Sequence, residues 1–190
     1  MIYGLSNVVS QGAMFLLLPF YSVILSKYEY GLIAKLEVYT FILCVFLSFS
    51  LDKAAQRLYF EYDREERVEI FSTLYLFLFI VTMSVFLVTV LLWLHPKVGI
   101  ESIYLYAIGY CCFTVNGYLT AIYFQCIEKP IYYAIIKFST TALTVALITY
   151  SLLYVSAKAE TKILSELIVS LLLFPVHLYV FLKFFFHICV

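Results

Sequence analysis

The chain has 190 residues, of which 65% are hydrophobic, 19% are aromatic and only 13% carry a charge, and its mean hydropathy is +1.02. A soluble domain of this length holds about 25% charged residues and could not bury so much apolar surface, so the composition excludes a soluble globule. The formal net charge is zero, which gives no electrostatic reason to expect nucleic acid as a partner.

The apolar residues form six long blocks, each long enough for a helix to cross a hydrocarbon layer of roughly 30 Å. Outer-membrane strands would instead alternate over about ten residues, which these blocks do not do. We therefore predict an all-α polytopic membrane protein, a single bundle of six transmembrane helices, over residues 2–25, 32–51, 70–94, 103–127, 131–155 and 163–186. The connections are short apart from residues 52–69. A weak excess of basic residues in that connection favours placing it, and both ends of the chain, in the cytoplasm.

The first span carries polar residues at membrane depth. Asn7 and Gln11 are four residues apart, with Tyr3 and Ser10 on the same side of a helix. Two interpretations are open: hydrogen bonds between helices, or one wall of a water-filled cavity. We predict that Asn7 and Gln11 line a central cavity.

The segment Leu51–Glu69 holds ten of the 24 charged residues and all three arginines. Lys53 and Arg57 are spaced to stack on one helix face, where they repel each other unless an anion bridges them, and phosphate suits an arginine side chain. The competing interpretation pairs Arg57 with Glu61 in a solvated turn. We predict that Arg57 faces the bundle interior or its cytoplasmic mouth.

Three further polar residues lie within spans. Lys137 is a candidate site residue because a charge at membrane depth is costly, although its long side chain could also reach the interface. Asn116 and His177 fit contacts between helices better than a site. Four acids lie near span ends, which favours an anionic over a cationic substrate: Glu37, Asp52, Glu128 and Glu166.

No catalytic or cofactor motif occurs in the sequence. The five cysteines lie in or beside apolar blocks without C-x-x-C spacing, as expected of small buried hydrophobic residues. We therefore predict that the chain is not an enzyme and has no cofactor and no metal site.

Three short motifs resemble a known family. YGLSNVVSQGAMFLLLPFYSVILSKYEYGLI is similar to the first helix and loop of polysaccharide or O-antigen flippases of the Wzx type. SLDKAAQRLYFEYDREERVEIFST is similar to the exit of the family's second helix, and EKPIYYAIIK to the loop that enters the fifth. The resemblance covers most of the chain.

Membership would imply one lobe of the MATE-like fold of the multidrug/oligosaccharidyl-lipid/polysaccharide exporters, which have twelve to fourteen spans in two lobes. It would imply a multi-pass protein of the bacterial cytoplasmic membrane that carries a lipid-linked (polyprenyl-pyrophosphate) oligosaccharide between leaflets. By motif position Arg57 would contact the pyrophosphate, with Lys53 and Lys137 as weaker candidates.

The sequence thus predicts a flippase lobe acting in cell-surface polysaccharide assembly. Its partners would be the lipid-linked oligosaccharide, membrane lipids and a second six-helix lobe or a second copy of the chain, with no nucleic acid. We expect the chain to be an incomplete N-terminal lobe that does not move substrate alone. Two alternatives stay open: half of a MATE-type drug or cation exporter, and a non-transporting membrane fragment or scaffold.

Overall fold

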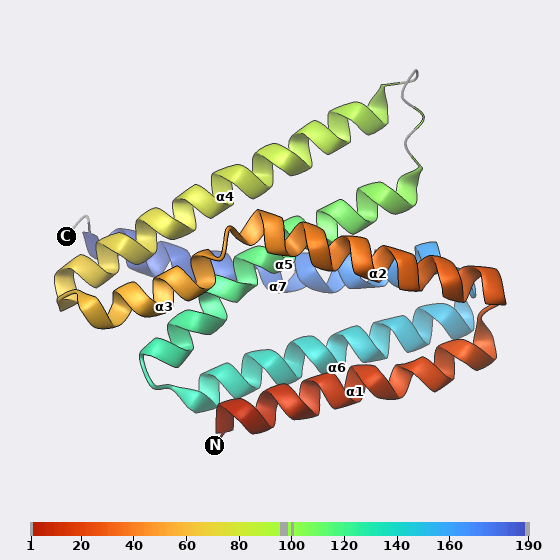
Figure 1. The fold of residues 1–190 in the computed structure, drawn as a ribbon, viewed down its shortest axis with the longest axis horizontal. Helices are drawn as coiled ribbons and strands as arrows, with labels where there is room; N and C mark the ends of the chain where they lie inside the picture. Colours follow the sequence, from red (N-terminus) through yellow and green to blue (C-terminus); the bar gives the residue numbers. More distant parts are fainter. Residues whose placement is uncertain (1, 96–98, 100, 189–190) are drawn as a thin grey trace.

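The computed structural model describes residues 2–95, 99 and 101–188, with the backbone alone for residues 64, 65, 181 and 183–188. The described residues form seven α-helices and no strand (Figure 1). The helices are α1 (Ile2–Ile24), α2 (Lys27–Ser48), α3 (Leu51–Glu61), α4 (Arg64–Leu94), α5 (Ser102–Cys126), α6 (Pro130–Tyr154) and α7 (Ala159–Ile188).

Six stretches of the described helices are long and apolar enough to cross a membrane, with α2 and α3 counted as one. This confirms the predicted all-α, polytopic membrane architecture. The first turn of α1 and the last turn of α7 lie at the same end of the bundle as the turn between α3 and α4, on the left in Figure 1. That placement agrees with an even number of crossings, whereas the resemblance to one MATE-like lobe stays a prediction.

Helices α2 and α7 begin earlier than predicted because polar side chains stabilise their first turns. Residues 26–31 were expected to form a connection, but Ser26 caps α2 by accepting a hydrogen bond from the Glu29 N–H at 3.2 Å. The Glu29 carboxylate in turn accepts a 2.7 Å hydrogen bond from the Ala159 N–H at the start of α7. As a result, Lys162, which was placed in a loop, lies inside a helix.

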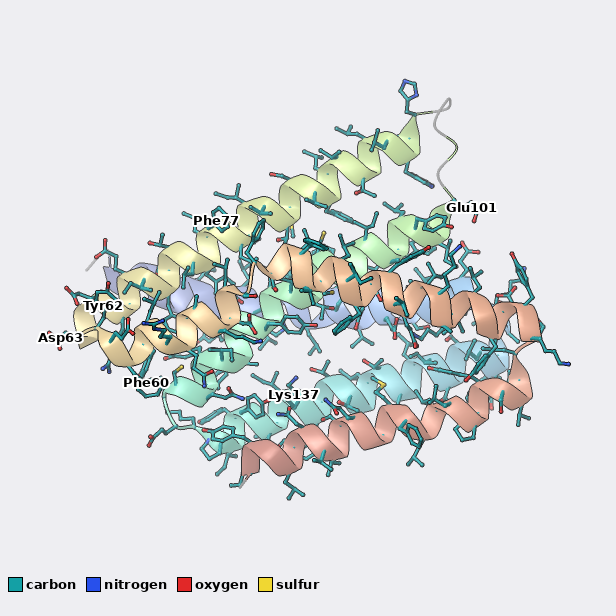
Figure 2. The ribbon with its side chains drawn as sticks, viewed as in Figure 1. Phe60, Tyr62, Asp63, Phe77, Glu101 and Lys137 are labelled. Atoms are coloured by element: carbon teal, nitrogen blue, oxygen red, sulfur yellow. The ribbon has the colours of Figure 1, made fainter. Side chains whose placement is uncertain are left out.

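The predicted long connection over residues 52–69 is wrong, since nearly all of it is helical. The chain breaks only at Phe49 and Ser50, whose φ angles of 48° and 52° are left-handed, and then continues as α3. The turn into α4 consists of Tyr62 and Asp63, which lie together at one tip of the molecule (Figure 2). The Asp63 N–H donates to Glu66 Oε2 at 3.4 Å.

Helix α5 is the centre of the bundle and contacts α2, α3, α4, α6 and α7, most extensively α7. One buried apolar cluster joins α5 to α2, α3 and α4, and a second joins it to α1, α2, α6 and α7. Helices α1 and α6 lie side by side as a pair below α5 and α7 in Figure 1. The candidate site lies between this pair and the α5–α7 layer.

Candidate functional site

A cavity of about 350 Å³ lies at membrane depth between α1, α5, α6 and α7. We call it the central cavity. Its volume is within the range of pockets that hold small ligands. Polar side chains from all four helices line it: Ser10, Gln11, Tyr110, Thr114, Tyr118, Lys137, Thr140, Thr141, Thr144, Glu166, Ser170 and His177.

Lys137 is the basic residue of this lining, and it extends from the side of α6 that faces α5 (Figure 2). It lies seven residues from the start of α6, or about 10 Å along the helix axis. Among the described residues no carboxylate is within ion-pair distance of its Nζ atom, and the nearest aromatic contact is the Tyr133 ring, at 6.0 Å. Lys137 therefore presents an uncompensated positive charge to the cavity.

Hydroxyl groups on α6 extend the polar surface beyond Lys137. Thr140, Thr141 and Thr144 donate to the carbonyl oxygens of Ile136, Lys137 and Thr140, at 2.7, 2.9 and 2.8 Å. Their donors are thus used within the helix, and their lone pairs remain available as acceptors.

Two buried groups of the lining lack any partner among the described residues: Ser10 Oγ and His177 Nδ1. Buried polar atoms are almost always hydrogen-bonded, so these two are free to bind a ligand or water in the cavity. Sequence reasoning treated His177 as a contact between helices, and its ring does pack against Gly117 of α5, although its Nδ1 has no partner among the described residues. His177 is 8% exposed.

The polar stripe of α1 divides between the two interpretations offered for it. Gln11 lines the central cavity as predicted. Asn7 does not, because its Oδ1 accepts a 2.8 Å hydrogen bond from Tyr133 Oη of α6, which makes it a contact between helices. The prediction that both side chains line the cavity is therefore wrong for Asn7.

Of the two placements expected for Arg57, the bundle interior is wrong, whereas the cytoplasmic mouth stays a prediction. Its side chain is 80% exposed, and its Nε donates to Glu61 Oε1 at 2.7 Å, one turn along α3. Lys53 is exposed as well, and neither residue lines the central cavity. Helix α3 packs against α4 and α5, but Lys53 and Arg57 lie on its exposed side, so the pairing of Arg57 with Glu61 is the interpretation that holds.

The remaining arginine with a described side chain stabilises the turn between α3 and α4. The Arg67 guanidinium lies 4.6 Å from the centre of the Tyr59 ring, and its Nε donates to the Tyr62 carbonyl oxygen at 2.7 Å. The side chain of Arg64 lies outside the described residues. The charge-dense segment is thus a helical turn closed by local contacts.

A buried ionic cluster was not foreseen. Lys162 is 2% exposed, and its Nζ lies 2.9 Å from Glu37 Oε1 of α2 and 2.7 Å from Glu166 Oε1 of α7. Glu166 also lines the central cavity. Sequence reasoning placed Glu37 and Glu166 near span ends and Lys162 in a loop. The i, i+4 spacing of Lys162 and Glu166 was the signal that could have found the pair.

Asn116 was expected to be a contact between helices, and its amide nitrogen fits that role, while its Oδ1 has no partner among the described residues. Asn116 is fully buried in α5, and its Nδ2 donates to Thr82 Oγ1 of α4 at 3.0 Å and to the Cys112 carbonyl oxygen at 2.7 Å. Tyr75 of α4 lies in the same region, with its Oη 2.6 Å from Thr120 Oγ1. These bonds fix α4 against α5 beside the cavity.

Comparisons with family models, with curated proteins and with solved structures found no match to this chain. Its function is therefore argued from the cavity and from the sequence.

Proposed function

We propose that the chain is one lobe of a flippase in the bacterial cytoplasmic membrane and that it binds a lipid-linked oligosaccharide in the central cavity. The observation that carries the proposal is Lys137, an uncompensated cation at membrane depth in a cavity that both polar and apolar side chains line. Such groups are costly in a bilayer and mark sites of function. An ammonium group beside a cavity favours an anionic ligand, and phosphate oxygens are strong acceptors for it.

The rest of the lining fits the sugar of such a ligand. Sugar hydroxyls both donate and accept, and the threonines of α6 supply acceptors while Ser10 and Gln11 supply further polar groups. The rings of Tyr110 and Tyr118 lie on the α5 side, and aromatic rings offer broad apolar faces with a polar tip. In this proposal Lys137 replaces Arg57 as the residue that contacts the phosphate.

Binding of a polyprenyl-pyrophosphate-linked sugar to the purified chain in lipid nanodiscs tests the proposal. We expect Lys137→Gln to weaken binding by at least about tenfold, since a hydrogen bond to a charged group contributes about 1.5–3 kcal/mol. Arg57→Gln is the matched control, because its side chain is exposed on α3, and it should leave binding unchanged. Equal affinities of the two variants would contradict the proposal.

A second candidate is a cation exporter of the same architecture, and Glu166 is the observation that favours it. This carboxylate lines the central cavity about 10 Å along α7, where a bound cation would need an acid. Its charge is already opposed by Lys162 at 2.7 Å, which favours the flippase. Binding of a lipophilic cation that is lost in Glu166→Gln and kept in Lys137→Gln would support the exporter instead.

A further inference from the structure

A second cavity, of about 530 Å³, lies between α1, α2 and α7 and opens widely to the outside of the bundle beside the exposed Gly12 and Phe15. We call it the side cavity. Three residues line both cavities: Gln11, Met14 and Glu166. They stand between the two spaces, and we refer to them as the partition. The side chain of Met14 is unbranched and adapts readily to a change in its surroundings. The side chain of Gln11 has no hydrogen-bond partner among the described residues. Glu166 is therefore the residue of the partition whose position is fixed by a contact.

Glu166 is anchored by the buried ionic cluster. Lys162 holds Glu166 and Glu37 through the same nitrogen atom, at 2.7 and 2.9 Å. The side chains of Lys162 and Glu166 are 3% and 12% exposed, whereas that of Glu37 is 47% exposed. The position of Glu166 in the partition therefore depends on its ion pair with Lys162.

The cluster carries an unbalanced charge. Two carboxylates share one ammonium group, which leaves a formal charge of minus one among residues that are mostly buried. Burial of an uncompensated charge is unfavourable, and neighbouring carboxylates disfavour each other's ionised form. Uptake of one proton would make the cluster neutral, with Lys162 paired to a single carboxylate.

The surroundings of Glu166 supply no other cation that could balance the cluster at close range. Lys137 of α6 lines the same central cavity but lies toward its other end, because α6 and α7 run in opposite directions and each residue is seven positions from its helix start. No titratable side chain of α4 lines either cavity over the described part of the chain. The titratable groups that interact electrostatically with Glu166 or share its cavity are Lys162, Glu37, Tyr21, Tyr110, Cys111, Tyr118, Lys137 and His177.

We propose that Glu166 is a proton-binding gate between the central cavity and the side cavity. A proton from water in either cavity adds to the Glu166 carboxylate, which then loses its charge and its ion pair, while Lys162 stays paired with Glu37. The neutral side chain leaves Lys162, and the two cavities join into one passage along α7. The gate does not depend on the identity of the transported ligand, so it stands apart from the proposed function.

Cysteine accessibility in sealed vesicles tests the gate. Ser170→Cys places a thiol in the central cavity one turn from Glu166, and Gly12→Cys places one in the side cavity, where an added Cβ meets open space. A membrane-impermeant thiol reagent is added on the face from which Gly12→Cys reacts. The measured quantity, the labelling ratio, is the labelling rate of Ser170→Cys divided by that of Gly12→Cys. Taking the ratio cancels the reagent's own pH dependence. Labelling of the chain that lacks both substitutions is the background.

We expect this ratio to rise at least about fivefold when the pH falls from about 7.5 to about 5, since the protonated fraction of an ionised carboxyl group grows about tenfold per pH unit. Glu166→Gln should give the high ratio at both pH values. Glu37→Gln should give the low ratio at both, because it leaves Lys162 and Glu166 as a neutral pair. Glu37 is half-exposed, so this variant retains the fold if Glu166→Gln does not. Two results would overturn the proposal. One is a labelling ratio that does not change with pH when Glu37, Lys162 and Glu166 are all intact, and the other is a high labelling ratio in Glu37→Gln.

Discussion

Lys162 and Arg57 show how differently two basic residues of one membrane protein are used. Lys162 is 2% exposed and is held by carboxylates from two helices. Arg57, by contrast, pairs with Glu61 through a side chain that is 80% exposed. An exposed pair of this kind contributes little to stability, but a buried pair leaves an uncompensated charge when one partner is removed. Burial therefore decides which ionic contact contributes to stability, although the sequence concentrates its charges around Arg57.

Replacing Lys162 tests this difference. Lys162→Met keeps the length of the side chain but leaves Glu37 and Glu166 without a cation, and we expect it to destabilise the fold by about 3 kcal/mol. Thermal unfolding of the purified chain in detergent, followed by circular dichroism, measures the change. Arg57→Met is the matched control and should leave Tm within error. An unchanged Tm in Lys162→Met would show that the buried cluster does not hold α2 to α7.

Single residues of the candidate site were predictable only in part. Lys137 and Gln11 could be found from the sequence because polar side chains within apolar spans face the bundle interior or a cavity rather than lipid. Asn7 could not be told from Gln11, since its partner Tyr133 is 126 residues away. Half of the Lys162 cluster was predictable, because Glu166 is four residues away on the same helix, whereas Glu37 is 125 residues away.

At the scale of elements, the chain breaks between α2 and α3, just before the charged segment. Two consecutive residues, Phe49 and Ser50, adopt left-handed φ angles, which side chains other than glycine rarely do. The contact between the Phe49 and Phe77 rings, with centroids 6.0 Å apart, holds one side of this break. The break thus has a conformational cost that the packing of α2 against α4 offsets.

Glycine at position 50 should relieve part of that cost. We expect Ser50→Gly to raise the stability of the fold by about 1 kcal/mol, because the left-handed conformation costs a residue with a side chain about 1–2 kcal/mol. Ser22→Gly in α1 is the same chemical change at a helical position and should lower stability by about 0.5 kcal/mol. Chemical denaturation of both variants gives the sign of each effect, and a loss of stability in Ser50→Gly would contradict the strain at this break.

The spanning helices were predictable because their apolar blocks are long and uninterrupted. The error lay in residues 52–69. Their high density of charge was interpreted as a connection, but nearly all of them belong to α3 or to the first turns of α4. Arg, Lys and Glu are good helix formers, and hydropathy alone does not distinguish a polar helix from a polar connection. Similarly, α7 begins before its apolar block because the Glu29 carboxylate satisfies the Ala159 N–H.

At the scale of the whole molecule, the cavities follow from how the helices are grouped. The pair α1–α6 lies beside the α5–α7 layer, with the central cavity between them, while the side cavity separates α1 from α2. A sequence can place polar residues on a helix face but does not state which faces meet. Helix α1 contributes to both cavities, so its position relative to α7 sets whether they are separate.

This grouping leads to a last prediction, which rests on the proposed function: one copy of the chain binds its ligand but does not translocate it. Secondary transporters with such bundles alternate access by moving one bundle against another around a site at their interface. The described residues form one bundle, in which α5 packs against nearly every other helix, so no second body is present to move. Vesicles that hold a single copy should show no transfer of a fluorescent polyprenyl-pyrophosphate-linked sugar between leaflets. If two copies form the working unit, the fraction of vesicles that show transfer should equal the fraction that hold two or more copies. Transfer in vesicles with a single copy would contradict the prediction.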